Sequence, residues 1–375
     1  REGFEGLELQ GSNTWLEDSN GNQDYNVLYG WAADKMNGFA AFEYEHRSQL
    51  EIKEKDWALK PLLDNVLGGY SLTGMPGTIY ALNPDAADGT GRSNRGPDSG
   101  CAPLGGQPYF GSLCSFQFSF FDNLIEKTNT YKSYGEFNYE VSDSSKFHVE
   151  AMYSRLDMPN WKSSPAYPPN SLFTKDRIVP VNNPGLIAYK AANPAQFPTL
   201  PNGTVAADQT VFDRSRMLGV NGRDGEPLSA YRKTNTWRLA TSLIGDAFDD
   251  QLGYNFGVSY SHRERSSNGY DMQIQGMGFA LNGYGGPGCF APGGSVPLYG
   301  PGQGGTGVGV NRVGGCQFYN PFSNAIAFSA VTGGPNTYNF VPALANSREL
   351  INWLTLVTWF WASQALKLSM FCWSM

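Results

Sequence analysis

The chain has 375 residues, a formal net charge of −7, 14% aromatic residues and only 16% charged residues, and it holds 45 glycines and 23 prolines. Ordinary soluble domains carry about 25% charged residues. The abundance of aromatic residues and the scarcity of charge argue against a helical bundle, a coiled coil and a doubly wound enzyme. The negative net charge argues against binding to a nucleic acid.

The dominant pattern along the chain is an alternation of apolar and polar side chains with a period of two. It is clearest in Gln251–Arg265, where the even positions from Leu252 to Tyr260 are apolar and the odd positions are Gln, Gly, Asn or Ser. This period indicates a strand with one apolar and one wet face. The alternation predicts seven strands, in chain order Gly3–Thr14, Tyr25–Ala33, Ala40–Arg47, Tyr131–Val141, Lys146–Ser154, Asn235–Gly245 and Gln251–Arg265.

The connections between these strands are alternately short and long. Residues 34–38, 142–145 and 246–250 have the length of hairpin turns and are rich in Asp, Asn, Ser and Gly. Stretches of roughly 70–80 residues, near 51–130, 159–233 and 266–347, separate the hairpins. This arrangement is typical of an outer-membrane barrel. We therefore predict an all-β fold, a fragment of an antiparallel transmembrane β-barrel with about 7–8 long strands, short periplasmic turns and long extracellular loops.

Four tyrosines, Tyr131, Tyr139, Tyr153 and Tyr260, lie towards the ends of the predicted strands. An aromatic girdle at the membrane interface uses such positions. Cross-strand packing in a soluble β-sandwich favours the same residues. The strands are longer than those of most soluble sheets, and this length favours the girdle.

Four of the five cysteines fall into two pairs, each within one long loop. Cys101 and Cys114 lie in the first loop, and Cys289 and Cys316 lie in the third. We expect two local disulfides, each worth about 3 kcal/mol for a closed loop of about 15 residues. Disulfides imply an oxidising compartment. The alternative is four free thiols in a reducing cytosol.

Catalytic, metal and cofactor sites are not expected. The three histidines, His46, His148 and His262, fall in or beside strands without the spacing of a metal site or a catalytic triad. Two pairs of glutamates lie on the polar side of their strands: Glu43 with Glu45, and Glu136 with Glu140. Paired carboxylates can act in glycosidase chemistry. The polar interior of a barrel explains these pairs better. The glycine pattern of residues 302–307 lacks the strand, helix and acidic residue of a dinucleotide site.

The hairpin from Tyr131 to Arg155, the opening Gly3–Leu9, and the loop motifs Val181-Asn182-Asn183-Pro184 and Tyr319-Asn320-Pro321-Phe322 resemble parts of TonB-dependent outer-membrane receptors. The likeness covers about residues 1–350 and rests on strand, turn and loop style together. It implies a barrel of about 22 strands around a plug. Such receptors import scarce ligands, and an inner-membrane complex drives the uptake through a short N-terminal segment.

The resemblance is partial. Seven or eight strands are about one third of such a barrel. No globular plug precedes Gly3, and neither a coupling segment nor an aromatic-terminated closing strand is evident. We therefore expect residues 1–350 to be a partial barrel that cannot transport alone, because open sheet edges cannot sit in lipid.

Residues 351–375 form an atypical hydrophobic tail. They hold one charged residue, Lys367, and the run Leu354–Leu366 has no alternation. The apolar run is short of the ~20 residues of a transmembrane helix. A second interpretation is an eighth strand at Arg348–Leu356 that passes into something else. Our preferred hypothesis is that translation leaves the native reading frame near Thr355, so that the tail is a frameshift or truncation artefact.

The sequence thus predicts a fragment of a receptor in the bacterial outer membrane that imports a siderophore, a vitamin or an oligosaccharide, with its long loops binding the ligand outside the cell. Its expected partners are outer-membrane lipid and, in the full-length receptor, the TonB energising complex. Neither catalysis nor a cofactor is expected. The alternative is a secreted, soluble β-sandwich that binds carbohydrate or mediates adhesion. A passive porin is disfavoured because the loops are long.

Overall fold

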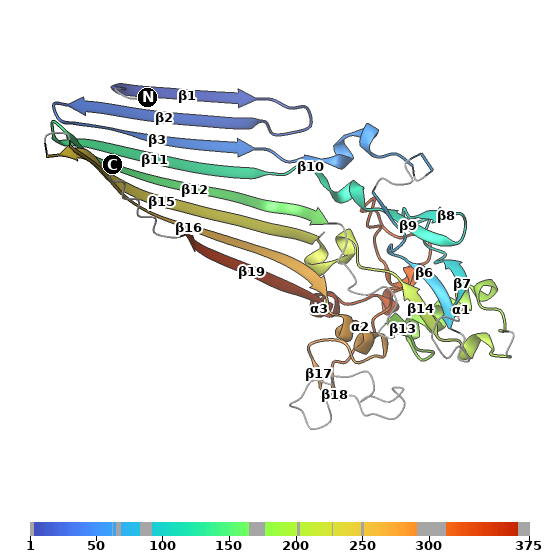
Figure 1. Cartoon of the computed structure of the whole chain (residues 1–375). Helices are drawn as coiled ribbons and strands as arrows, with labels where there is room; N and C mark the ends of the chain where they lie inside the picture. Colours follow the sequence, from blue (N-terminus) through green and yellow to red (C-terminus); the bar gives the residue numbers. More distant parts are fainter. Residues whose placement is uncertain are drawn as a thin grey trace.

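The structure is a computed structural model, and it describes residues 4–61, 63–64, 69–82, 92–164, 177–200, 203–226, 228–248, 251–290 and 313–366. These residues form one long antiparallel sheet with a smaller, irregular body at one end (Figure 1). The fold is mostly β, which confirms the predicted fold class at that level.

The long sheet has eight strands, and its edges are the first and the last. In sheet order the strands are β1 (Gly6–Thr14), β2 (Asn22–Ala33), β3 (Met36–Arg47), β11 (Thr128–Ser142), β12 (Ser145–Ser164), β15 (Leu228–Ala247), β16 (Leu252–Met272) and β19 (Thr355–Leu366). Each long strand pairs antiparallel with the next long strand along the chain. The sheet is not closed into a barrel among the described residues.

All seven predicted strands lie in this sheet, and several are longer than predicted. β12, β15 and β16 have 20, 20 and 21 residues and continue past the alternating segments. The eighth strand, β19, lies in the tail and pairs with β16 from Met272–Thr355 to Ser261–Leu366. The structure has an eighth strand, but not where the second interpretation placed it: Arg348–Leu354 is a helix, and the strand runs over Thr355–Leu366. Residues 367–375 lie outside the described residues.

The pairing register gives the sheet two continuous faces. One row across it runs through Leu9, Val27, Phe42, Ser133, Tyr153, Trp237 and His262, and the adjacent row, which points to the other side, runs through Gln10, Asn26, Glu43, Lys132, Ser154, Thr236 and Arg263. We call the side of the first row the aromatic face and the side of the second row the polar face. Glu43 with Glu45, and Glu136 with Glu140, share the polar face as predicted.

The aromatic face is uncovered among the described residues. Many of its large apolar side chains are about 40–70% exposed, for example Leu9 at 68%, Tyr29 at 53%, Leu239 at 50% and Phe256 at 47%. A soluble protein rarely leaves so large an apolar surface open unless that surface contacts a partner or a membrane. No second sheet packs against it in the described part of the chain.

The three long connections fold together into one body, which we call the head (described residues of 48–127, 177–226 and 273–354). Its small sheets contain β6 (Thr78–Leu82), β7 (Arg92–Pro97), β13 (Ile178–Val179) and β14 (Val211–Arg214); β5 (Tyr70–Ser71), β8 (Gln107–Tyr109) and β9 (Leu113–Gln117); β4 (Leu50–Glu51) and β10 (Asn123–Ile125); and β17 (Cys289–Phe290) and β18 (Val313–Gly314). The first of these sheets joins two connections, because β14 of the second pairs with β6 of the first.

Three short helices complete the head, α1 (Pro184–Ala192), α2 (Ile274–Leu281) and α3 (Arg348–Leu354). Single 3-10 turns lie at Ile52–Glu54, Asp56–Ala58, Phe118–Phe121, Pro194–Gln196, Ala206–Asp208, Gly219–Asn221, Arg223–Gly225, Ser323–Ala325 and Pro342–Leu344. Pro184 at the first turn of α1 suits a helix start, and Asn183 before it caps the helix.

The main core of the protein lies in the head and not in the sheet. Ile79 from the first connection, Leu186 and Val211 from the second, and Phe322 and Leu350 from the third are fully buried members of one cluster. The long connections lie where the sequence predicted long loops, but the core that the three connections share was not predicted. Apolar residues scattered over three connections bury one another only when all three meet, so no single connection shows a periodic pattern.

Candidate functional site

A cluster of five polar side chains lies in the middle of the polar face: Tyr134 and Glu136 on β11, His148 and Glu150 on β12, and Arg238 on β15. The Tyr134 hydroxyl is 3.0 Å from a Glu136 oxygen and 3.2 Å from a Glu150 oxygen. Arg238 forms an ion pair with Glu150. The His148 ring nitrogens lie 3.8 Å from Glu136 and 4.0 Å from Glu150.

This cluster joins side chains from three strands, and the sequence did not predict that these side chains lie together. Glu136 was expected beside Glu140, but the register places Glu150 directly opposite Glu136. Like charges opposite each other destabilise a strand pair. The Tyr134 hydroxyl and the Arg238 guanidinium beside the two carboxylates offset that repulsion.

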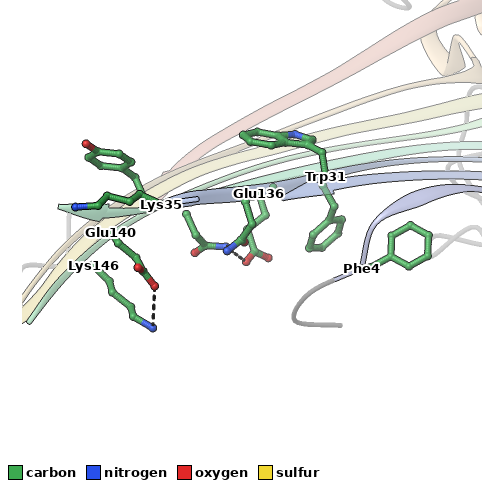
Figure 2. A pocket seen from close by; sticks show the side chains of 11 residues that line it. Phe4, Trp31, Lys35, Glu136, Glu140 and Lys146 are labelled. Atoms are coloured by element: carbon green, nitrogen blue, oxygen red, sulfur yellow. Dashed lines mark hydrogen bonds and ion pairs between the residues drawn. The ribbon is translucent and has the colours of Figure 1, made fainter. Parts of the chain in front are cut away.

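A pocket of about 410 Å³ opens at the turn end of the sheet (Figure 2). Figure 2 shows Glu140 and Lys146 on one side of the sheet and Trp31 on the other. Phe4 lies against Gly30, where a Cβ atom would be 2.2 Å from the Phe4 carbonyl oxygen. A side chain at position 30 would therefore push the N-terminal segment off the sheet. The charges of this pocket are mixed, with Lys146 Nζ 3.9 Å from Glu140.

The two loop motifs that resemble the receptor family contact each other in the head. The Asn183 side chain accepts hydrogen bonds from the backbone amides of Gly185 and Leu186, at 2.9 and 3.3 Å. Its amide nitrogen donates to the carbonyls of Leu281 and Tyr319, both at 3.0 Å. A Cβ atom on Gly185 would lie 2.2 Å from the Asn320 side chain, so the close approach requires glycine.

Two carboxyl groups are buried in the head. Asp98 accepts hydrogen bonds from the hydroxyl and the amide of Ser323 and from the amide of Gly100. Burial raises the pKa of Asp98 to about 6, against these hydrogen bonds, which lower it. Burial likewise raises the pKa of Asp213 to about 7, and its hydrogen bond from Ser215 opposes the shift.

The head also buries a lysine. Lys190 Nζ donates to the Gln209 carbonyl at 2.5 Å and to the Ala207 carbonyl at 3.4 Å. Burial lowers the pKa of Lys190 to about 8. A buried ammonium is costly unless it is paired or hydrogen-bonded, and these carbonyls meet part of that need. Lys190 therefore fixes α1 against the turn at Ala206–Asp208.

The four cysteines of the predicted pairs meet as disulfides in the head. Cys101 joins Cys114 with a Cα–Cα distance of 5.9 Å, and both are 1% exposed. Cys289 joins Cys316 with a Cα–Cα distance of 4.4 Å. A Cβ atom on Gly106 would lie 2.7 Å from the Cys101 sulfur, so the first disulfide packs directly on that glycine. The glycine pattern of residues 302–307 lies outside the described residues.

The other two histidines, His46 and His262, contact an asparagine, a tryptophan and a glutamate. His46 Nδ1 is 2.7 Å from the Asn129 side-chain oxygen, and His262 lies 5.9 Å from the Trp237 ring and 3.4 Å from Glu264. Within the described ranges, no group of three or more His, Cys, Asp or Glu side chains is arranged to hold a metal ion.

Comparisons with known proteins give no relative: no family model, no curated protein and no solved structure matches the chain. In the described part of the chain, no helix has the length and apolar character needed to cross a membrane. The site must therefore be interpreted from its own geometry.

Proposed function

We propose that this chain is part of a TonB-dependent outer-membrane receptor that imports a scarce ligand. The eight long strands are a portion of its barrel wall, the aromatic face contacts lipid, and the polar face lines the lumen. The head stands outside the cell and meets the ligand. Closing the barrel requires further strands beside β1 and β19, because lipid offers no partner to an open strand edge.

The observation that carries this proposal is the spacing of aromatic rows on the exposed apolar face. Near the head, Tyr25, Tyr44 and Tyr131 follow one another across three strands, with ring centroids 6.4 and 5.1 Å apart. Near the turns, Met36, Tyr139, Phe147, Leu243 and Phe256 lie in one row.

The two rows are separated by the eight residues from Tyr131 to Tyr139, about 27 Å along the strand at ~3.4 Å per residue. This is of the order of the ~25 Å apolar band between the aromatic girdles of membrane barrels. Of the four tyrosines expected in a girdle, Tyr131 and Tyr139 lie in these rows. Tyr260 is opposite Leu239, halfway between the rows, because the strand end is further from Tyr260 than the sequence suggested.

The opposed ends of the sheet also support the proposal. Short turns connect the strands at one end, and the head with its two disulfides occupies the other. An oxidising exterior permits such disulfides. The soluble β-sandwich is less well supported, because a sandwich buries the apolar face of its sheet against a second sheet, and none covers the aromatic face in the described residues.

The proposal is tested by the accessibility of single cysteines in bacterial cells that make the protein from its full reading frame. Tyr338→Cys in the head and Asp143→Cys in a turn are introduced into a Cys372→Ser background; both parent side chains are exposed. A membrane-impermeant maleimide should label Tyr338→Cys in intact cells and Asp143→Cys only after the outer membrane is permeabilised.

Outer-membrane fractions are collected in parallel. Recovery of the protein in the soluble fraction without detergent, or equal labelling of both cysteines in intact cells, would rule out the membrane assignment.

A further inference from the structure

Four arginines form a column on the polar face of β15 and β16, near the head. They are Arg232, Arg238, Arg263 and Arg265. Arg238 is opposite Ser261, Arg263 opposite Thr236, Arg265 opposite Thr234 and Arg232 opposite Ser267. From the row of Arg238 to the row of Arg232 the column covers six residues, about 20 Å along the strands. Successive guanidinium groups therefore lie on one face as direct or diagonal neighbours.

Half of this positive charge, that of Arg263 and Arg265, has no ion-pair partner among the described residues. Glu150 pairs with Arg238. On one side of their rows, β12 contributes Ser154 and Leu156. On the other side, β19 contains no charged residue.

The acidic residues in the rows of Arg263 and Arg265 are Asp24 on β2 and Glu43 and Glu45 on β3. The nearer two, on β3, are four strands away from β16, about 19 Å at ~4.8 Å per strand. That separation exceeds the Debye length of about 8 Å at physiological ionic strength. The polar face therefore has an acidic side and a basic side that do not neutralise each other. Arginines two residues apart on one face repel, and an anion bound between them would remove that repulsion.

Hydroxyl groups frame the column. Each arginine has a serine or a threonine as its cross-strand partner, and these hydroxyls can donate further hydrogen bonds. A guanidinium group presents its donors as a planar fork that matches the two oxygens of a carboxylate or a phosphate. Forks from neighbouring strands with hydroxyls between them match a ligand with several anionic groups, more than a single ion.

We propose that the arginine column binds a small ligand that carries two or more carboxylate or phosphate groups. If the polar face lines the lumen, which rests on the proposed function, the column defines the imported ligand as an anionic one. Binding itself depends only on the column and is measured independently of the membrane.

The test is calorimetric titration of the full chain in neutral detergent micelles with citrate and tripolyphosphate, at low and at physiological salt. Both anions should bind, and binding should weaken as salt rises. Glucose and spermidine serve as neutral and cationic probes and should not bind. R263Q/R265Q should lower the affinity for both anions at least about tenfold, since two charge-assisted forks are lost.

The matched control is K35Q/K146Q, which removes the same charge from the turn end of the sheet and should change the affinity by less than about twofold. R263K/R265K keeps the charge without the fork and should give an intermediate loss. If R263Q/R265Q does not fold, R263K/R265K and the salt dependence of the unaltered chain decide the question.

The proposal is overturned if neither anion binds at low salt, or if R263Q/R265Q and K35Q/K146Q weaken binding equally. The two proposals fail separately. An outer-membrane protein that binds no anion keeps the proposed function and loses the anionic ligand, whereas a soluble protein that binds citrate through the column keeps the site and loses the receptor.

Discussion

The side-chain amide of Asn183 donates a hydrogen bond to the backbone carbonyl of Tyr319, at 3.0 Å and across 136 positions of sequence. The same side chain caps α1 and also reaches the carbonyl of Leu281. One buried residue thus starts a helix in the second connection and holds two parts of the third. Its neighbour Asn182 is partly exposed, and the structure gives its side chain no comparable role.

Replacing Asn183 should therefore destabilise the head. Asn183→Ala removes the cap and leaves two buried carbonyls without their donor, at a combined cost of about 2–4 kcal/mol. Asn182→Ala should change the stability by less than about 0.5 kcal/mol. Urea-dependent proteolysis of the detergent-solubilised protein, with head fragments identified by mass spectrometry, measures both. Equal midpoints for the two variants would show that Asn183 does not connect the segments.

The stability of the head should depend on pH through its buried carboxyl groups. Burial raises the pKa of Asp98 from 3.8 to about 6 and that of Asp213 from 3.8 to about 7. Between about pH 4 and pH 7 the folded head therefore holds protons that the unfolded chain has released. Stability is greatest below this window and falls as the pH rises through it, by an amount on the order of a few kcal/mol.

The check is the urea midpoint of the head at pH 5 and at pH 8. Asp98→Asn and Asp213→Asn imitate the protonated side chains, so the double variant should lose most of the difference between the two conditions. The pKa of Lys190 is lowered to about 8, so the cost of burying its charge falls only as the pH rises above that value. Lys190 therefore contributes little to the difference between pH 5 and pH 8. A head that is more stable at pH 8 than at pH 5 would contradict the assignment.

Removing the first disulfide should loosen the head without affecting the sheet. Cys101→Ser with Cys114→Ser opens a loop with a sequence separation of 13 residues, which should cost about 3 kcal/mol. The change is expected in the hydrogen exchange of head peptides, while peptides of β11 and β12 stay protected. Cys372→Ser is the control for the loss of a cysteine. Faster exchange throughout the sheet would mean that the two bodies unfold together.

Charge on the two faces of β15 should have opposite consequences. Leu239 lies on the aromatic face midway between the aromatic rows, and Ala240 points to the polar face. In a membrane, Leu239→Arg should cost about 2–4 kcal/mol, because an arginine at mid-bilayer must leave water. Ala240→Arg should cost less than about 1 kcal/mol on a lumen face. Urea titration of vesicle-inserted full-length protein measures the difference, and similar costs would argue against lipid on the aromatic face.

The sheet could be predicted from the sequence because each long strand alternates over many residues. The side chains from Leu252 to Tyr260 alternate between the aromatic and the polar face, so the period of two appears in the residues themselves. The disulfides were predictable because the two cysteines of each pair lie within one connection. β19 gave no such signal, and its strand depends on pairing with the edge of β16.

The head could not be predicted in this way. β13 has two residues and β14 has four, too few for any period, and β14 pairs with β6 from a different connection. The partner of Asp98 is 225 positions away. The full arginine column could not be predicted either. Arg263 and Arg265 are close in the sequence, but Arg232 and Arg238 join them only through the register of β15 with β16.

The two edge strands of the long sheet should control the association of the purified chain with itself. β1 and β19 each pair on one side only among the described residues, so each presents a row of backbone amides and carbonyls to its surroundings. Such edges are templates for another strand. A second copy of the chain carries the same open edges, so two copies can extend one sheet by pairing edge to edge. We expect the purified chain to form polymers at a rate that rises with its concentration.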